Sequence, residues 1–190
     1  MKKSLGAATI ALPTPTWLVG TYDSDGKANI ATIAWGGICC SEPPAVAVSL
    51  RKSRYTYDAI IKRKAFTVNV APEAYAAAAD YAGIASGRNA DKFAAAGLTS
   101  VKSELVDAPY IAEFPLVLEC RLLQTVEIGI HIQFIGEIVD VKAEEAVLNA
   151  DGNVDAAKLR PLIYSPADRN YYGIGEVVGK GFDIGKKFMK

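Results

Sequence analysis

The chain has 190 residues, 51% of them hydrophobic and 22% charged, so it can bury a sizeable core, and we expect a single domain over residues 1–190. Its 21 lysines and arginines balance its 21 aspartates and glutamates. A zero net charge does not supply the cationic surface on which non-specific nucleic-acid binding depends, so no nucleic-acid partner is expected.

The three cysteines, two of them adjacent, fit neither a disulfide framework nor a CxxC metal or redox motif. A protein of the reducing cytoplasm is therefore expected. Residues 1–12 are too weakly apolar for a signal peptide, and we expect them to belong to the mature domain. No apolar run approaches the roughly 20 residues that cross a bilayer, so no membrane segment is expected. With one histidine, a site of several imidazoles is excluded, and we expect no metal.

Two strands joined by a turn are expected near the start of the chain, at residues 17–22 and 29–35. The turn between them, residues 23–27, is polar, and its Gly26 can adopt a positive φ. Its two aspartates could suggest a calcium loop. No third acidic ligand follows at loop spacing, which favours a plain hairpin turn.

The middle of the chain is expected to be helical and its flanks to be β-strands. Helical spacing and propensity predict the helices, and β-branched apolar runs predict the strands. The expected strands are 45–50, 65–70, 115–128, 130–141 and 161–164, and the expected helices are 57–64, 73–81 and 90–96. Residues 165–172 are expected to form an extended loop. Long paired strands with few helices indicate a mainly β protein, a β-barrel with short helices.

Residues 29–56 carry the pattern that suggests a function. Gly36 and Gly37 follow Trp35, so the backbone there can approach a flat ligand closely. The strand at 45–50 ends in a dense set of cations and hydroxyls: Ser49, Arg51, Lys52, Ser53, Arg54, Tyr55 and Thr56. Such donors beside a helix start suit a phosphate, while small residues near an aromatic suit a planar ring. The two needs together suggest flavin mononucleotide (FMN).

Several segments, in their order and spacing, resemble the FMN-binding split-barrel flavin reductases and, within that family, the flavoredoxins. They are residues 32–35, 40–44, 51–56, 66–69, 86–93, 131–136 and 170–172. The resemblance covers almost the whole chain and implies a homodimeric FMN-binding split barrel. It implies one of two oxidoreductase-related functions, an electron carrier between redox partners or a flavin reductase that uses NADH or NADPH, and the sequence does not separate them. A flavin-binding protein without its own redox partner, and a pyridoxamine-phosphate-oxidase-like enzyme, remain as further alternatives.

The resemblance also implies roles for individual residues. His131 corresponds to the family's Gly-x-His position and is expected to relay a proton or position the donor, although a lone histidine on a strand is more often structural. Cys40 stands where many relatives carry serine, so a thiol packed against the ring replaces a hydroxyl contact. The expected cofactor-binding residues are Thr32, Ala34, Trp35, Gly36, Cys40, Ser49, Leu50, Arg51, Tyr55, Thr56, Lys92 and Tyr171.

Overall fold

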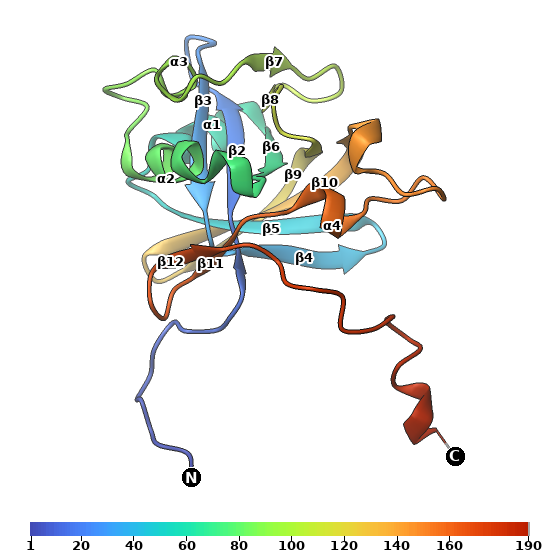
Figure 1. Ribbon diagram of the computed structural model, residues 1–190. Helices are drawn as coiled ribbons and strands as arrows, with labels where there is room; N and C mark the ends of the chain where they lie inside the picture. Colours follow the sequence, from blue (N-terminus) through green and yellow to red (C-terminus); the bar gives the residue numbers. More distant parts are fainter. Residues whose placement is uncertain (190) are drawn as a thin grey trace.

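The computed structural model describes residues 1–189, which form a mainly β structure with short helices (Figure 1). Seven antiparallel strands form the main sheet in the order β3-β2-β6-β9-β10-β5-β4. They are β2 (Trp17–Tyr22), β3 (Ala28–Ile33), β4 (Gly36–Ser41), β5 (Pro44–Arg51), β6 (Ala65–Val70), β9 (Leu116–Ile128) and β10 (His131–Ala143). The edge strands β3 and β4 are consecutive in the chain, and Trp35 in the connection between them accepts from the N–H of Ser49 of β5 at 2.8 Å.

Smaller elements complete the fold. The α-helices are α1 (Tyr55–Arg63), α2 (Ala76–Ile84), α3 (Lys92–Ala96) and α4 (Ala156–Leu159), and the 3-10 helices are η1 (Glu73–Tyr75), η2 (Glu145–Val147) and η3 (Lys186–Phe188). Two small antiparallel sheets pair β1 (Thr14–Pro15) with β11 (Ile163–Ser165) and β12 (Asn170–Tyr172), and β7 (Ser100–Lys102) with β8 (Pro109–Ile111). Among residues 1–189, no helix has the length and apolarity that a membrane crossing requires.

The structure differs from the sequence-based expectations about strands at three places. The strand expected at 29–35 ends at Ile33, and residues 36–41, which were not expected to pair, form β4 against β5. The loop expected at 165–172 contains β12, because the chain turns back at Arg169, which has a φ of 60°, and pairs with β11. Both β4 and β12 pair in a hairpin with the strand next to them in the chain, and this pairing outweighs the weak strand propensity of their own residues.

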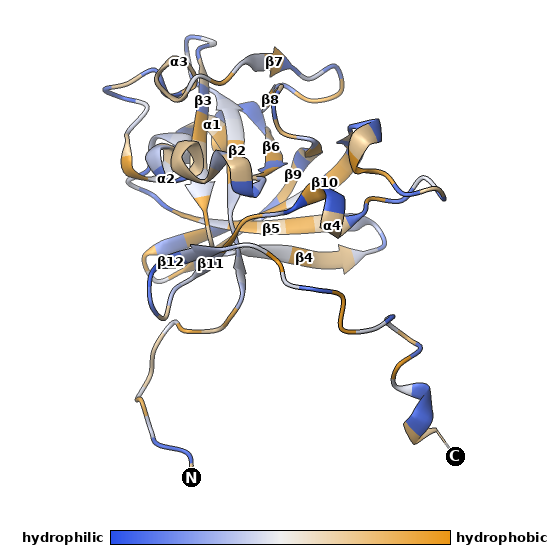
Figure 2. Cartoon of the chain, in the orientation of Figure 1, coloured by the Kyte–Doolittle hydropathy of each residue, from blue (hydrophilic) through white to orange (hydrophobic). Residues whose placement is uncertain are grey.

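The core consists of two clusters, one on each side of the sheet strands β2, β3 and β6. Phe66 and Phe134 are fully buried in the first cluster, which fills the interior between β5, β6, β9 and β10. A Cβ at residue 136 would lie 2.5 Å from Phe66, so Gly136 makes room for that ring. The second cluster lies beneath α2 and α3 and includes Leu18, Ile30 and Phe93. Figure 2 shows apolar colouring along β5 and β10, which contribute to the first cluster.

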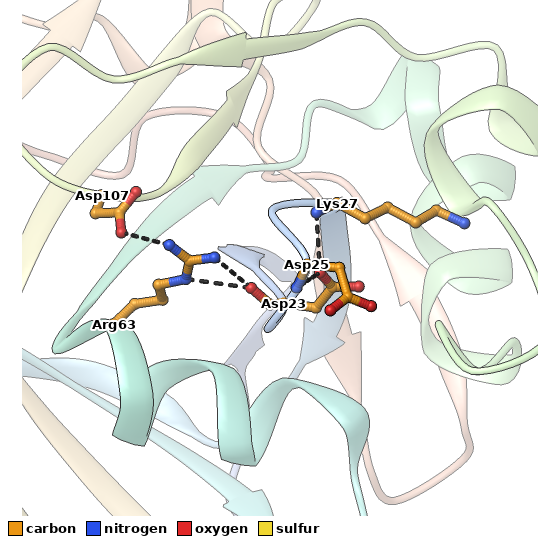
Figure 3. Close-up of polar contacts among 5 residues, drawn as sticks. All are labelled: Asp23, Asp25, Lys27, Arg63 and Asp107. Atoms are coloured by element: carbon orange, nitrogen blue, oxygen red, sulfur yellow. Dashed lines mark hydrogen bonds and ion pairs between the residues drawn. The ribbon is translucent and has the colours of Figure 1, made fainter.

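A polar cluster fixes the β2–β3 turn to the end of α1 (Figure 3). The Arg63 guanidinium donates to the backbone carbonyl of Asp23 and pairs with the Asp107 carboxylate at 2.9 Å. The Asp23 carboxylate accepts from the backbone N–H groups of Asp25 and Lys27 at 2.8 and 2.9 Å. Burial alone would raise the pKa of Asp23, but these bonds and one from Tyr55 outweigh burial and lower it. The turn and helix α1 are thus held together as one unit.

Candidate functional site

Three adjoining hollows lie where β3, β5, α1 and α2 meet, and Thr32 lines all of them. We call them the cationic cavity, of about 260 Å³, the tryptophan hollow, of about 260 Å³, and the tyrosine hollow, of about 350 Å³. The hydroxyl of Thr32 donates to the carbonyl of Ala79, which joins β3 to α2 at the centre of the site. A single elongated ligand could therefore extend from one hollow into the next.

The cationic cavity lies at the N-terminus of α1. The helix begins after Arg54, whose side chain does not cap it, so the side chain of Arg54 does not occupy the backbone N–H groups of Tyr55 and Thr56, which have no carbonyl one turn earlier in the helix. Arg51 and Arg54 line the cavity with Ser53, and none of the described residues that line it carries a carboxylate. Helix dipole and side-chain charges therefore both favour an anion here.

Lys92 adds a buried cation to this cavity. Its side chain is only 5% exposed, and its ammonium donates to the carbonyls of Ile30 and Ala82 at 2.8 and 2.7 Å. No carboxylate within residues 1–189 forms an ion pair with it. Burial, followed by the nearby Arg54 guanidinium, lowers the pKa of Lys92 to about 8. An ammonium with two neutral acceptors and one remaining donor would be stabilised by an anion in the cavity.

Thr56 and Tyr55 lie at the same helix start but differ in where their hydroxyls are bound. Thr56 is 1% exposed and accepts a hydrogen bond from Asn29 at 3.1 Å. The hydroxyl of Tyr55 donates to the Asp23 carboxylate at 2.7 Å, so its ring rather than its hydroxyl is available to the cavity. The Arg88 guanidinium lies 5.7 Å from the centre of that ring and donates to the Ser53 carbonyl at 3.0 Å. Arg88 thereby ties the 85–89 loop to the cavity.

The tryptophan hollow brings Trp35 and His131 together from opposite sides of β5. Residues 32–35 pass along one side, and Ser49, Leu50 and Arg51 of β5 line it as well. His131 is the first residue of β10 and pairs directly with Arg51. The hollow thus has an aromatic wall and two nitrogen-rich side chains beside the cationic cavity, an arrangement that suits a planar heterocycle.

The tyrosine hollow lies on the other side of Thr32. Tyr171 of β12 is half-buried, its ring centre is 5.4 Å from that of Tyr164, and its hydroxyl donates to Asp80 of α2 at 2.9 Å. Burial and this bond raise the pKa of Tyr171, so its hydroxyl stays protonated. Ala34 and Arg169 also line the hollow, which has an aromatic floor and a cation.

Eleven of the thirteen residues expected from the sequence line at least one of the three hollows. They are Thr32, Ala34, Trp35, Ser49, Leu50, Arg51, Tyr55, Thr56, Lys92, His131 and Tyr171. Gly36 and Cys40 lie outside. A Cβ at Gly36 would meet Trp17 and Ile33 at 2.8 Å, and the thiol of Cys40 is exposed on β4 and contacts the Glu42 carbonyl.

The structure adds lining residues that were not among the expected cofactor-binding residues. Ser53 and Arg54 belong to the cationic run already noted, and Ser86 with Gly87 belongs to a segment that carries the resemblance. Asp80, Tyr164 and Arg169 come from three separate elements and give no local signal.

Comparisons with known proteins place the chain among flavoproteins. Residues 9–175 match the family model described as flavin reductase like domain. Flavoredoxin of Desulfovibrio vulgaris (Miyazaki F) is 55% identical, with a TM-score of 0.94 over 98% of this chain and 100% of that chain. Flavoredoxin from Methanosarcina acetivorans is 31% identical, with a TM-score of 0.92 over 100% of both chains. The reductase component of 4-nitrophenol 4-monooxygenase/4-nitrocatechol 2-monooxygenase from Rhodococcus opacus is 33% identical over 126 residues, 65% of this chain and 63% of that protein. These similarities confirm the expected split-barrel fold.

Proposed function

The chain belongs to the flavin reductase like domain family, and on this premise we propose that it binds FMN and carries electrons between redox partners. When bound, the flavin supplies the redox chemistry, and the protein binds it, orients it and controls access to it. The observation that carries the proposal is the cationic cavity at the N-terminus of α1, which opens toward a hollow with an aromatic wall.

The donors of the cationic cavity fit a phosphate monoester. Arg51, Arg54 and Lys92 supply cations, Ser53 and Thr56 supply hydroxyls, and the start of α1 supplies backbone N–H groups. The buried ammonium of Lys92 is the strongest support, because a buried cation without a carboxylate partner is costly unless a ligand compensates it.

The boundaries of this cavity favour FMN over a dinucleotide flavin. Arg88 bridges from the 85–89 loop to the carbonyl of Ser53 and to the ring of Tyr55. Because Ser53 and Tyr55 line the cavity, we propose that this bridge bounds its phosphate end, past which a dinucleotide would have to continue. We therefore name FMN as the cofactor.

Residues of the tryptophan hollow would hold the ring and handle its protons. The backbone and side chains of residues 32–35 form one wall, and Trp35 provides apolar contact. The His131 imidazole can donate or accept a proton at a ring atom beside it, or position a donor molecule there. Cys40 and Gly36 would act at a greater distance from the ring than the lining residues.

We propose that the protein is a homodimer. Ile38 on edge strand β4 and Ile130 in the β9–β10 turn are each 65% exposed; Ile130 directly precedes His131, and Ile38 follows Trp35 after two glycines. Exposed apolar side chains favour association with a second copy, and the edge of β4 that carries Ile38 has no neighbouring strand on its outer side. Three free thiols, two of them exposed, support our placing the protein in the reducing cytoplasm.

A flavin reductase that takes electrons from NADH or NADPH is the second candidate. It is favoured by the similarity to a protein named as a reductase component and by the tyrosine hollow, which offers Tyr171 and Arg169 beside the proposed ring position. The two functions differ in which donor reduces the bound flavin.

The cofactor assignment can be tested on the purified protein. Flavin released by heat is identified by chromatography and quantified against protein. We expect one FMN per chain. Retention of FAD in preference to FMN would refute the proposal that Arg88 bounds the phosphate end of the cationic cavity. Failure of the protein to bind any flavin would refute the proposed function.

A further inference from the structure

Asn29 lies in β3 beside the cationic cavity, although it does not line the cavity itself. It is 4% exposed, and its amide nitrogen donates to the Thr56 hydroxyl oxygen at 3.1 Å. Its carbonyl oxygen is also buried and has no hydrogen-bond partner among residues 1–189. Buried polar atoms in folded proteins are nearly always paired, so a buried amide held against Thr56 calls for an explanation.

The neighbours of the amide determine which of its two ends faces Thr56. A Cβ at Gly87 would lie 2.3 Å from Asn29 Oδ1, so a Cα hydrogen of Gly87 points at this oxygen. An oxygen can accept a weak C–H···O contact there, whereas an amide N–H in its place would face a hydrogen and find no acceptor. The amide nitrogen therefore faces Thr56.

This orientation determines what the Thr56 hydroxyl can do. A hydroxyl has one hydrogen to donate, and because Thr56 accepts from Asn29, its hydrogen remains available. A threonine in a helix can give this hydrogen to a carbonyl of the preceding turn, but among residues 1–189 the Thr56 hydroxyl only accepts, from Asn29, and donates no such bond. A negatively charged oxygen in the cavity is a stronger acceptor.

We propose that Asn29 is a positioning residue of the phosphate end: its amide occupies the Thr56 oxygen and so directs the Thr56 hydroxyl hydrogen at the phosphate of the cofactor. Asn29 acts only through Thr56 and touches no ligand. The inference rests on the proposed binding of FMN. It also explains the glycine at position 87, because a side chain there would displace the Asn29 oxygen and turn the amide.

The experiment compares two ligands that differ by one phosphate. Apoprotein is titrated with FMN and with riboflavin, using the wild type, Asn29→Leu, Thr56→Val and the double variant. Thr56→Val is expected to weaken FMN binding roughly 10- to 100-fold and Asn29→Leu roughly 3- to 10-fold, with riboflavin affinity unchanged in both. In the double variant the loss should equal that of Thr56→Val alone, since Asn29 then has no hydroxyl to direct.

Two further variants keep the test decisive. Thr21 pairs directly with Asn29 across the β2–β3 ladder and is fully buried, so Thr21→Val is a matched control that should leave both affinities unchanged. If Asn29→Leu does not fold, Asn29→Asp keeps the shape of the side chain. Its carboxylate takes the Thr56 hydrogen, so FMN binding should fall at least as far as in Thr56→Val.

Equal weakening of FMN and riboflavin in the Asn29 variants would overturn the inference, because it would indicate a purely structural role. Losses that add in the double variant would overturn it as well. A wild-type protein that binds riboflavin as tightly as FMN would instead refute the phosphate site on which the proposed function depends.

Discussion

Raising the pH through about 8 should weaken FMN binding, because Lys92 loses its proton in that range. Burial and the nearby Arg54 lower the pKa of Lys92 from 10.5 to about 8 in the protein without ligand. A phosphate stabilises the protonated ammonium, so the proton is required for the strongest binding. The dissociation constant of FMN should therefore rise by up to about tenfold for each pH unit above the pKa, until the pKa of the complex is reached.

The same pKa shift acts on the stability of the apoprotein with the opposite sign. The pKa of Lys92 is 10.5 in the unfolded chain and about 8 in the folded chain, so the folded chain loses this proton at a lower pH. Between these values the unfolded state binds more protons, so the free energy of unfolding rises with pH. At neutral pH the shift corresponds to a cost of about 3 kcal/mol, which bound phosphate would offset.

Fluorescence titration with FMN between about pH 7 and pH 9.5 measures this dependence. Lys92→Met removes the titrating group, so its affinity should be lower at neutral pH and nearly constant over the range. Lys102→Met, at an exposed lysine of β7, should behave like the wild type. An FMN affinity of the wild type that does not change with pH, or the same decline in Lys92→Met, would refute the assignment of Lys92 to the phosphate.

Four other changes test separate parts of the site. Arg51→Ala should lower FMN affinity by about 1.5–3 kcal/mol if it makes a charge-assisted bond, measured by calorimetry, and an unchanged affinity removes it from the phosphate site. Arg88→Ala should speed FMN release in stopped-flow displacement, because the bridge to Ser53 is lost, and an unaltered release rate contradicts this. His131→Asn should retain FMN but slow its reduction by roughly 10²-fold if the imidazole relays a proton, and normal rates would make the residue structural. Ile38→Lys should yield monomers in sedimentation, whereas a persistent dimer would place the interface elsewhere.

The fold class could be predicted because the residue types within the two long strands indicate β-structure without information from the rest of the chain. Residues 116–128 and 131–143 are β-rich and nearly continuous, and Gly129, with a φ of 55°, supplies the turn between them. Strand β4 could not be predicted in the same way, because Gly36 and Gly37 have little strand propensity and are held only by pairing with β5. The β4–β5 hairpin pairs these glycines with Val48 and Ala47, and the glycines themselves do not signal that pairing.

The candidate site likewise has residues that the sequence indicated and residues that only the fold brings to the site. The run from Ser49 to Thr56 is contiguous, so its chemistry was visible in the sequence. Lys92 would ordinarily be taken for a surface lysine, and only the fold turns its ammonium inward to the carbonyls of Ile30 and Ala82. The pairing of Asn29 with Thr56 joins residues 27 positions apart and depends on how α1 sits on β3.

Anaerobic reduction of the FMN-loaded protein tests the central claim most directly. The visible absorption of the bound flavin is followed after mixing with a reduced redox protein and, separately, with NADH and NADPH. We expect the redox protein to bleach the flavin faster than either nucleotide, and a second redox protein to reoxidise the reduced flavin. Faster bleaching by NADH or NADPH would identify a flavin reductase, and a bound flavin that no donor reduces would contradict a redox function altogether.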